Sequence, residues 1–300
     1  MKSILLPLLS LFWLFTGTAQ KNNEQLLRVP YKSVVAGEER DFFLYLPKNY
    51  NKDKEKSWPV LLFLHGNGER GNGKDELDFV MIHGPLYEAW IQKRDLPFIM
   101  IVPQLHMFGM GEVDYIKNRS RNQIPQRLKD GVPQRPERFA TNYPMQPKPA
   151  VALDTFPQIF PPDGWDKVEN DLLGMIEHVK ANYRVDEKRL YLSGLSYGGF
   201  GTWYMASKHP NTFAAAVPVV AFGMPEFMEP IAKAQLPVWC FAGGRDPVVP
   251  NEFFYAGLNH LESLGHKNVR FTIEADMGHD AWTRVYGGED VYTWLLSHNK

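Results

Sequence analysis

The sequence predicts an α/β fold, in which a doubly wound and mostly parallel sheet has helices on both faces. Short and almost uninterrupted apolar runs, such as 60–64 and 98–102, are typical of strands that are covered on both sides in a parallel sheet. Segments with helical periodicity, such as 166–183, alternate with these runs along the chain. Because sheets of this kind bind ligands at the carboxyl ends of their strands, we expect the functional site in the loops that follow the strands.

The expected elements follow one another in a regular order. Residues 41–46 alternate polar and apolar side chains and end at Pro47, which favours an outer antiparallel strand. Further strands are expected at 60–64, 98–102, 189–193, 214–220, 236–242 and 269–273. Helices are expected at 166–183, 199–207 and 252–264. The first helix begins with a capping-box pattern of Asp166 and Glu169, and Gly265 ends the last one.

Composition limits the classes of function. The chain has 300 residues, 44% of them hydrophobic, which is enough for one large domain over 20–300. Its formal net charge is −1 and it has no long run of like charge, so neither nucleic acid nor an anionic membrane surface is expected as a partner. The sequence has no spacing typical of metal ligands and no phosphate-binding loop, so no metal and no cofactor are expected. The oligomeric state is left open.

The N-terminus has the pattern of a secretory signal peptide over 1–19. A basic start is followed by an apolar run at 4–15 and by small residues that suit cleavage after Ala19. The run is too short to span a bilayer as a helix, so no integral membrane segment is expected. An uncleaved anchor or a buried N-terminal helix is the alternative. Cys240, the single cysteine, falls in an expected core strand, which fits a secreted or periplasmic bacterial protein without disulfides.

Residues 105–164 interrupt the alternation of strands and helices. The segment is rich in proline, shows no helical or strand period and leaves from the end of the 98–102 strand, on the side of the expected site. Its aromatic residues argue against disorder; they are Phe108, Tyr115, Phe139, Tyr143, Phe156 and Phe160. Arg135 and Arg138 add basic groups that suit a uronic carboxylate. We interpret the segment as a lid or substrate-binding insertion; the alternative is a surface excursion that packs its aromatic side chains elsewhere.

One junction between an expected strand and an expected helix contains the run Gly194-Leu195-Ser196-Tyr197-Gly198. This is the pattern of a nucleophile elbow, in which a serine at a tight turn projects its hydroxyl clear of the sheet. Small residues two positions on either side let the strand and the helix pack closely around that turn. The pattern therefore predicts that Ser196 is a catalytic nucleophile.

An aspartate and a histidine that come later in the chain complete a catalytic triad. Asp246 and His279 each follow the carboxyl end of an expected strand. The chain order serine, aspartate, histidine is that of α/β-hydrolases. His279 is expected to take the proton of Ser196, and Asp246 is expected to orient the imidazole. Asp276, on the same loop as the histidine, is the alternative acid.

The strand at 60–64 runs into a His-Gly-Asn-Gly motif at 65–68, where hydrolases of this kind place an oxyanion donor. We expect the backbone N–H groups of Asn67 and Tyr197 to form the oxyanion hole. His65 is interpreted as a structural residue whose ring ties loops together by hydrogen bonds.

Three residues near these motifs are candidates for substrate binding. Glu69 and Arg70 directly follow the oxyanion motif, and they either form an ion pair within the loop or contact the substrate. Trp282 lies close behind the catalytic histidine, and it either lines the cleft or packs in the interior.

The motif-bearing segments are 64–71, 103–104, 192–199, 244–250 and 278–282. Together they resemble the secreted α/β-hydrolases that include feruloyl and acetylxylan esterases and relatives described as predicted peptidases. The resemblance covers roughly 40–104 and 165–296 and implies an α/β-hydrolase fold, esterase activity on acylated plant polysaccharides, and the same serine, aspartate and histidine as the triad. Tyr197 departs from the group, which commonly has Met at this position, and the insertion is longer than expected.

The sequence therefore predicts a serine carboxylic-ester hydrolase that acts through an acyl-enzyme on feruloyl or acetyl esters of plant-type polysaccharides or oligosaccharides. A serine peptidase on the same fold is one alternative. A non-catalytic carbohydrate-binding protein with a hydrolase shell is another, and the intact set of Ser196, Asp246 and His279 weighs against it.

Overall fold

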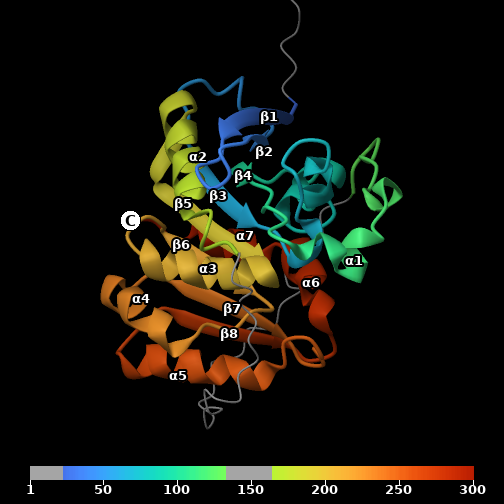
Figure 1. The fold of residues 1–300 in the computed structure, drawn as a ribbon. Helices are drawn as coiled ribbons and strands as arrows, with labels where there is room; N and C mark the ends of the chain where they lie inside the picture. Colours follow the sequence, from blue (N-terminus) through green and yellow to red (C-terminus); the bar gives the residue numbers. More distant parts are fainter. Residues whose placement is uncertain (1–22, 133–163) are drawn as a thin grey trace, which may run out of the picture.

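The computed structural model describes residues 23–132 and 164–300, which form an eight-stranded sheet with helices on either side (Figure 1). The strands are β1 (Gln25–Lys32), β2 (Glu39–Leu46), β3 (Trp58–Leu64), β4 (Ile99–Val102), β5 (Val185–Leu195), β6 (Ala215–Val219), β7 (Val238–Gly243) and β8 (Val269–Glu274). The expected signal peptide at 1–19 and the 133–163 part of the insertion, with Phe139, Tyr143, Phe156, Phe160, Arg135 and Arg138, lie outside the described residues.

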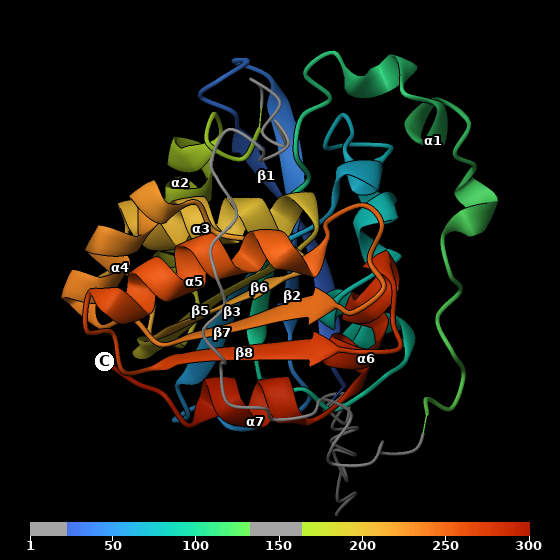
Figure 2. The same ribbon diagram turned by 90° about the horizontal axis from the view of Figure 1, so that it is seen from below.

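The helices cover both faces of the sheet. They are α1 (Asp114–Lys117), α2 (Glu169–Asn182), α3 (Tyr197–Lys208), α4 (Met228–Ala234), α5 (Phe254–Ser263), α6 (Trp282–Gly287) and α7 (Asp290–Leu296), with a π-helical turn at Tyr87–Ile91. Figure 2 shows α3, α4 and α5 on one face and α7 on the other. Buried side chains of α2 to α5 form one apolar layer, and those of α6, α7 and the π-helical turn form a second. None of the helices in the described part of the chain is long and apolar enough to cross a membrane.

The sheet has the order β1-β2-β4-β3-β5-β6-β7-β8. The six strands from β4 to β8 pair in parallel, whereas β1 and β2 are antiparallel to their neighbours. The prediction of a doubly wound, mostly parallel α/β fold is therefore confirmed. Because parallel strands end at the same edge of a sheet, the loops after β3, β5, β7 and β8 come together there.

The antiparallel strands differ from the expectation in one respect. The sequence pattern places 41–46 at the edge of the sheet, but β2 lies between β1 and β4, and 42–46 are all buried. The expected outer position is therefore wrong, because the run is apolar throughout rather than alternating. The edge strand is β1, whose side chains are mostly half-buried, so that its sequence does not stand out from that of a loop.

The start of α2 also differs from the expectation. The helix begins at Glu169, with Val168 at the N-cap and without a side-chain capping hydrogen bond, so the capping box of Asp166 and Glu169 is wrong. The carboxylate of Glu169 instead binds the hydroxyl of Tyr204 and, at 2.8 Å, the ring of His209. These bonds tie the first turn of α2 to α3.

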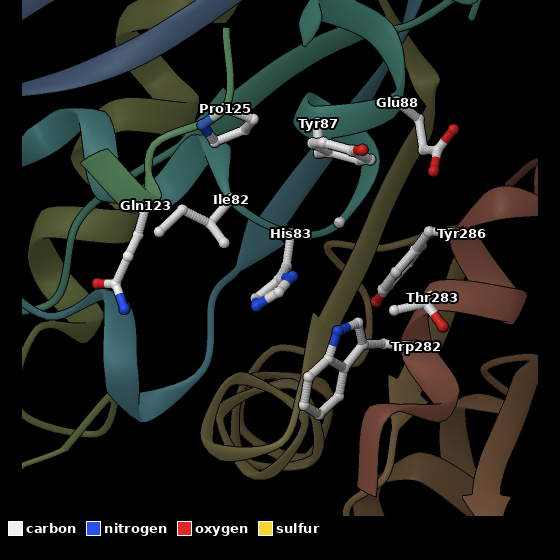
Figure 3. Close-up of a pocket in the computed structure, with 10 residues that line it drawn as sticks. Ile82, His83, Tyr87, Glu88, Gln123, Pro125, Trp282, Thr283 and Tyr286 are labelled. Atoms are coloured by element: carbon white, nitrogen blue, oxygen red, sulfur yellow. The ribbon is translucent and has the colours of Figure 1, made fainter. Parts of the chain in front are cut away.

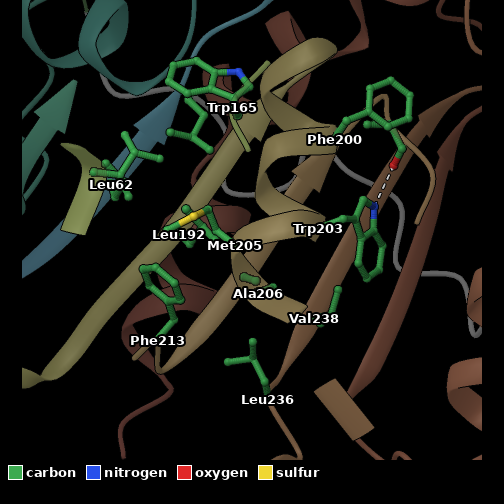
Figure 4. Close-up of a cluster of buried hydrophobic side chains, with 14 of the residues drawn as sticks. Leu62, Trp165, Leu192, Phe200, Trp203, Met205, Ala206, Phe213, Leu236 and Val238 are labelled. Carbon is green, nitrogen blue, oxygen red and sulfur yellow. Dashed lines mark hydrogen bonds between the residues drawn. The ribbon is translucent and has the colours of Figure 1, made fainter. Parts of the chain in front are cut away.

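Aromatic and aliphatic side chains fill the layer between α3 and the sheet (Figure 4). Trp203 on α3 is buried, and its indole N–H donates a hydrogen bond to the carbonyl of Ala221 at 3.0 Å. Phe200 on the same helix packs edge-on against Phe222, with ring centroids 5.2 Å apart. Burying one such side chain contributes about 2–3 kcal/mol. This packing fixes α3, which begins directly after Ser196.

The described part of the expected insertion, 105–132, packs on the loops that follow β3. The guanidinium of Arg119 donates a hydrogen bond to the carbonyl of Gly68 at 3.0 Å and lies 4.1 Å from the centroid of the Phe79 ring. Tyr115, on α1, accepts a hydrogen bond from the side-chain amide of Asn67. This part of the segment thus lies beside the expected oxyanion loop.

Candidate active site

Ser196 lies in a strained turn at the end of β5. Its backbone has φ 50° and ψ −118°, a region that costs a residue other than glycine of the order of 1–3 kcal/mol. The N–H of Ser196 donates to the carbonyl of Val219 on β6 at 2.9 Å, and α3 begins at the next residue. The turn therefore holds the hydroxyl at the edge of the sheet where the parallel strands end.

The two glycines of the elbow have no room for a side chain. A Cβ atom on Gly198 would lie 1.9 Å from the carbonyl oxygen of Leu64, and a Cβ atom on Gly194 would lie 2.2 Å from the carbonyl oxygen of Gly198. Both obstacles are backbone atoms, which cannot move aside as a flexible side chain could. The motif therefore has glycine at these two positions because, at each of them, another stretch of backbone passes too close to leave room for a Cβ atom.

The structure brings Ser196, Asp246 and His279 into one hydrogen-bonded chain. Ser196 Oγ lies 2.8 Å from His279 Nε2, and His279 Nδ1 lies 2.7 Å from Asp246 Oδ2. The other carboxylate oxygen of Asp246 accepts the N–H groups of Val248 at 2.8 Å and Val249 at 2.9 Å. With Nδ1 donating to the carboxylate, Nε2 is free to accept the serine proton.

Asp276, the alternative acid of the triad, is paired with an arginine and not with His279. Both carboxylate oxygens of Asp276 accept hydrogen bonds from Arg284, at 2.6 and 2.8 Å. This pairing lowers the pKa of the exposed Asp276 carboxyl to about 2. Asp246, by contrast, is buried and faces the imidazole. The geometry therefore favours Asp246 as the partner of His279.

The two expected oxyanion donors both begin helical turns. Asn67 is the first residue of a short 3₁₀ turn at Asn67–Glu69, and Tyr197 is the first residue of α3. The N–H groups of a first helical turn have no acceptor within their own helix, so they are available to a ligand. The side chain of Tyr197 points away from the site: it is buried, and the guanidinium of Arg70 lies 4.7 Å from its ring centroid.

His65 has the structural role that the sequence predicts. Its Nε2 accepts the N–H of Leu105 at 2.9 Å, so its Nδ1 carries the proton and donates to the carbonyl of Gly66 at 2.6 Å. Burial lowers the pKa of the imidazole to about 3, which keeps the ring neutral. The ring joins the oxyanion loop to the start of the insertion, and the prediction is confirmed.

A pocket of about 340 Å³, here called the serine pocket, opens over the triad. Its lining includes Asn67, Glu69, Tyr115, Ser196, His279 and Trp282. Arg70 points elsewhere: it is fully buried, donates from Nε to Asn67 Oδ1 and from Nη1 to the carbonyl of His106 at 2.8 Å. The expectation of substrate contact does not fit Arg70, because its side chain is used to hold the loop.

Glu69 is a buried carboxyl in the wall of the serine pocket. Its two oxygens lie 3.8 Å from His65 Nδ1 and 3.8 Å from His83 Nε2. Burial raises the pKa of Glu69 to about 7, partly offset by backbone N–H groups of its own loop and by Arg119. The carboxyl thus lies next to the expected oxyanion donors, and it is about half protonated near pH 7.

Trp282 stands between the triad and a second histidine. Its ring packs edge-on against His279, with centroids 5.2 Å apart, and lies 5.4 Å from the ring of His83 (Figure 3). Sequence reasoning missed His83 as a pocket residue, and it named Tyr115 only as part of the expected lid or substrate-binding insertion. His83 belongs to no motif, and Tyr115 is one aromatic residue among several in the insertion. Within the described residues, no cluster of three or more histidine, cysteine or acidic side chains could hold a metal ion.

The comparisons with sequences match parts of the chain. A model of the prolyl oligopeptidase family matches residues 165–229, which include the elbow but neither Asp246 nor His279. The chain is 44% identical over 45 residues to poly(3-hydroxyalkanoate) depolymerase C of Paucimonas lemoignei, covering 15% of this chain and 11% of that protein. It is 30% identical over 125 residues to the bifunctional acetylxylan esterase/xylanase XynS20E of Neocallimastix patriciarum, covering 40% of this chain and 17% of that protein. The match thus spans less than a fifth of either relative.

The comparisons with solved structures match almost the whole chain. A thermostable esterase superposes with a TM-score of 0.62 and 24% identity, over 92% of this chain and 63% of that one. A mutant feruloyl esterase module from Clostridium thermocellum, complexed with sinapinate, superposes with a TM-score of 0.57 and 14% identity, over 90% of this chain and 88% of that one. The chain therefore has the α/β-hydrolase fold, and it resembles the group that its motifs indicated.

Proposed function

We propose that this chain is a serine carboxylic-ester hydrolase that acts through an acyl-enzyme. The observation that supports this function best is the hydrogen-bonded chain from Ser196 through His279 to Asp246 at the edge where the parallel strands end. The strained elbow holds the serine hydroxyl in the serine pocket, and the N–H groups of Asn67 and Tyr197, each at the start of a helical turn, supply the oxyanion donors. Nucleophile, base, orienting acid and oxyanion donors are the four parts that acyl transfer requires.

In the acylation step, Ser196 Oγ attacks the carbonyl carbon of the ester while its proton passes to His279 Nε2. Asp246 stabilises the imidazolium that forms and keeps the ring in the productive orientation. The negative oxygen of the tetrahedral intermediate accepts hydrogen bonds from the N–H groups of Asn67 and Tyr197, and each such bond is worth about 3–4 kcal/mol. When the intermediate collapses, His279 returns the proton to the leaving alcohol.

Deacylation uses the same groups in the same order. A water molecule takes the place of the alcohol and loses a proton to His279 Nε2 as it attacks the acyl carbon. Collapse of the second intermediate returns the proton to Ser196 Oγ and releases the carboxylic acid. No other residue has to gain or lose a proton overall, so the cycle closes.

We further propose that the substrates are acyl esters of plant-type polysaccharides or oligosaccharides, feruloyl or acetyl. The names of two similar proteins, an acetylxylan esterase/xylanase and a feruloyl esterase module, support this class. A polysaccharide substrate suits an exported protein, and the pattern at 1–19 supports a secreted or periplasmic location. The carbohydrate ester is the only partner that the function requires.

A substrate panel tests the proposal. Purified wild type and Ser196→Ala are compared on an aryl acetate, methyl ferulate, an acetylated xylo-oligosaccharide, a long-chain acyl ester and a peptide. We expect the wild type to hydrolyse the acetyl or feruloyl esters and Ser196→Ala to lose that activity while keeping its circular dichroism spectrum. Cleavage of the peptide without ester hydrolysis would favour a serine peptidase, and inactivity on every substrate would favour a binding protein.

A further inference from the structure

A second set of serine, histidine and aspartate side chains lies outside the serine pocket. Ser33 lies in the loop between β1 and β2, His106 in the segment that follows β4, and Asp171 in the first turn of α2. All three side chains are buried, and we call them the anchor cluster. Ser33 Oγ lies 2.6 Å from Asp171 Oδ2 and 3.1 Å from His106 Nε2. The cluster thus joins three segments that are far apart in the sequence.

The hydrogen bonds of the anchor cluster run in the wrong direction for catalysis. Burial alone would raise the pKa of Asp171, but hydrogen bonds from the rest of the cluster and from a backbone N–H hold this pKa below its ordinary value. The carboxylate is therefore ionised and can only accept, so the Ser33 hydroxyl donates its single proton to Asp171. His106 Nε2 must then donate to Ser33 Oγ, and a protonated nitrogen cannot act as a base for the serine. The anchor cluster is not a second catalytic triad.

The anchor cluster fixes the position of His106. Besides the Ser33 hydroxyl, the Asp171 carboxylate accepts the N–H of Val34 at 2.7 Å, so it binds the loop between β1 and β2 at two points. Figure 1 shows α2 beside this end of the sheet. On its other side, the His106 ring stacks on Phe108, with centroids 5.0 Å apart and an angle of 21° between the planes. The side chain is held by α2 and the β1–β2 loop together, and its backbone is held with it.

The backbone at His106 in turn holds the oxyanion loop. The carbonyl of His106 accepts a hydrogen bond from Arg70 Nη1 at 2.8 Å. The preceding residue, Leu105, donates its N–H to His65 Nε2 at 2.9 Å and accepts the N–H of Gly71 at 2.9 Å. Residues 105–106 therefore bind the loop on both sides of the expected oxyanion donor.

Arg70 carries this link to both expected oxyanion residues. Its Nε donates to Asn67 Oδ1, and its guanidinium lies 4.7 Å from the centroid of the Tyr197 ring. The side chain of Arg70 is fully buried, so water cannot replace the His106 carbonyl if that carbonyl shifts. Because a buried donor that loses its acceptor costs free energy, the guanidinium has to follow the carbonyl. A displacement of His106 is therefore transmitted to Asn67.

We propose that the anchor cluster positions the oxyanion hole, so that Ser33, His106 and Asp171 are positioning residues for the reaction at Ser196. The inference rests on the proposed ester hydrolysis and deepens it, because the oxyanion hole matters only where an oxyanion forms. Its donors act on the transition state and hardly on the bound ester. Loosening the cluster should therefore lower kcat and leave KM nearly unchanged.

The first test cuts the link at His106. His106→Ala removes the donor to Ser33, whereas His106→Gln keeps an amide donor close to the position of Nε2. On an aryl acetate we expect His106→Ala to lower kcat about tenfold with KM within about twofold of wild type, because the oxyanion donor is displaced and not lost. His106→Gln should recover most of kcat. A loss that His106→Gln does not reduce would overturn the inference.

His266→Ala is the matched control. His266 is also buried, and its Nε2 is hydrogen-bonded to the carbonyl of Leu236 at 2.8 Å. It lies between α5 and β8, at the edge of the sheet where the parallel strands begin, opposite the triad. This variant should lower the melting temperature and leave kcat unchanged. A loss of kcat equal to that of His106→Ala would show that loss of stability alone explains the effect, and would also overturn the inference.

The second test asks whether His106 acts through Arg70. Arg70→Met breaks the link one step closer to Asn67, so His106→Ala should cost little further kcat when it is added to Arg70→Met. Losses that multiply in the double variant would contradict the inference. Ser33→Ala keeps the inference testable if His106→Ala does not fold, since it removes one hydroxyl from the cluster. It should lower kcat at least threefold with KM unchanged, and an unchanged kcat would contradict the proposed role.

A labelling rate separates this inference from the proposed function. A fluorophosphonate reacts with an activated serine, directs a phosphoryl oxygen at the oxyanion donors and needs no ester substrate. Its second-order rate constant with Ser196 should fall about tenfold in His106→Ala and recover in His106→Gln. Equal rate constants in the three proteins would refute the inference even if esters are hydrolysed. Labelling of Ser196 without hydrolysis of any ester would overturn the proposed function, and the tenfold difference would still support the anchor cluster.

Discussion

The two walls of the serine pocket are held in place in different ways. On one wall, where β5, β7 and β8 end, backbone atoms fix the positions: Ser196 donates its N–H to Val219, and Gly198 leaves no space for a side chain. On the other wall, hydrogen bonds from long side chains fix the positions. Arg119 binds the oxyanion loop, and Arg94 donates to two carbonyls at the end of α6, at 2.9 and 3.0 Å.

This difference separates most of the chemistry from substrate selection, since the Asn67 N–H is the one expected catalytic group on the second wall. A position that the backbone fixes tolerates almost no change, which suits groups whose geometry must be held within a fraction of an ångström. Where side chains fix a position, one substitution can alter it while the protein still folds. This suits a wall that determines substrate preference. Substitutions in the first wall should therefore reduce activity on every ester, whereas substitutions in the second should alter pH dependence or substrate preference.

The largest effect is expected from Asp246→Asn. The substitution removes the charge that supports the imidazolium and favours the wrong tautomer of His279, so kcat should fall by about 10⁴ on every ester. Asp276→Asn is the control, because that carboxylate binds Arg284 and should change kcat little. Steady-state kinetics on an aryl acetate provides the measurement. A larger loss in Asp276→Asn would assign the acid to the wrong residue.

A smaller loss should follow from Gly198→Ala. The added methyl group would lie 1.9 Å from the carbonyl oxygen of Leu64, so the elbow has to shift. A displacement of about 1 Å at the nucleophile can reduce activity about 10²-fold. Gly174→Ala, on an exposed turn of α2 with nothing within 4 Å of the new Cβ, should instead raise stability slightly, by about 0.5–1 kcal/mol. Full activity in Gly198→Ala would show that the close approach does not define the elbow.

The sequence predicts the first wall far better than the second. The elbow and the loops around Asp246 and His279 depend on local backbone geometry, and such geometry leaves a short motif of glycines and polar residues at fixed spacing. The second wall joins His83 to Trp282, two residues far apart in the sequence that belong to no common pattern. Their contact depends on how α6 packs, and α6 is too short to show a period.

The fold shows the same contrast. Buried parallel strands such as β3 are continuous apolar runs and are easily recognised. The edge strand β1 and the start of α2 were not predictable, because tertiary contacts decide them: Glu169 binds Tyr204 and His209 rather than capping its own helix. Local patterns therefore specify most of the sheet, and long-range contacts specify its edge and the wall opposite the elbow.

A pH-dependent effect is expected from Glu69→Gln on the second wall. Burial raises the pKa of Glu69 from its ordinary value of 4.5 to about 7, so the folded protein holds this proton more tightly than the unfolded chain. The stabilisation is complete below pH 4.5 and is lost as the pH rises through 7. Between pH 5 and pH 8 the free energy of unfolding of the wild type should therefore fall by on the order of 3 kcal/mol more than that of Glu69→Gln.

Urea unfolding at the two pH values measures this difference. His65 also contributes to the pH dependence, because burial lowers its pKa to about 3 in the folded protein while the unfolded chain keeps the ordinary value of 6.5, but this contribution is present in both proteins and cancels in their comparison. The ring of His83 also faces the carboxyl, and burial lowers its pKa as well. Unfolding free energies that change in parallel for the two proteins would show that the Glu69 carboxyl is not held as the structure indicates.

The smallest effect is expected from Tyr115→Phe. The substitution removes the hydroxyl that accepts a hydrogen bond from the Asn67 amide, at an exposed position on the second wall. One such bond is worth about 1 kcal/mol, so kcat/KM should change by no more than about fivefold. A loss as large as that of Gly198→Ala would mean that the side-chain wall holds the chemistry as firmly as the backbone wall.

The central claim is that Ser196 forms the covalent intermediate. Reaction of the purified chain with a fluorophosphonate, followed by intact-mass and peptide mass spectrometry, tests it most directly. The account predicts one adduct per chain, located on Ser196, together with its absence in Ser196→Ala and a strongly slowed reaction in His279→Ala. An adduct on another residue, or no adduct on a folded chain, would contradict the account.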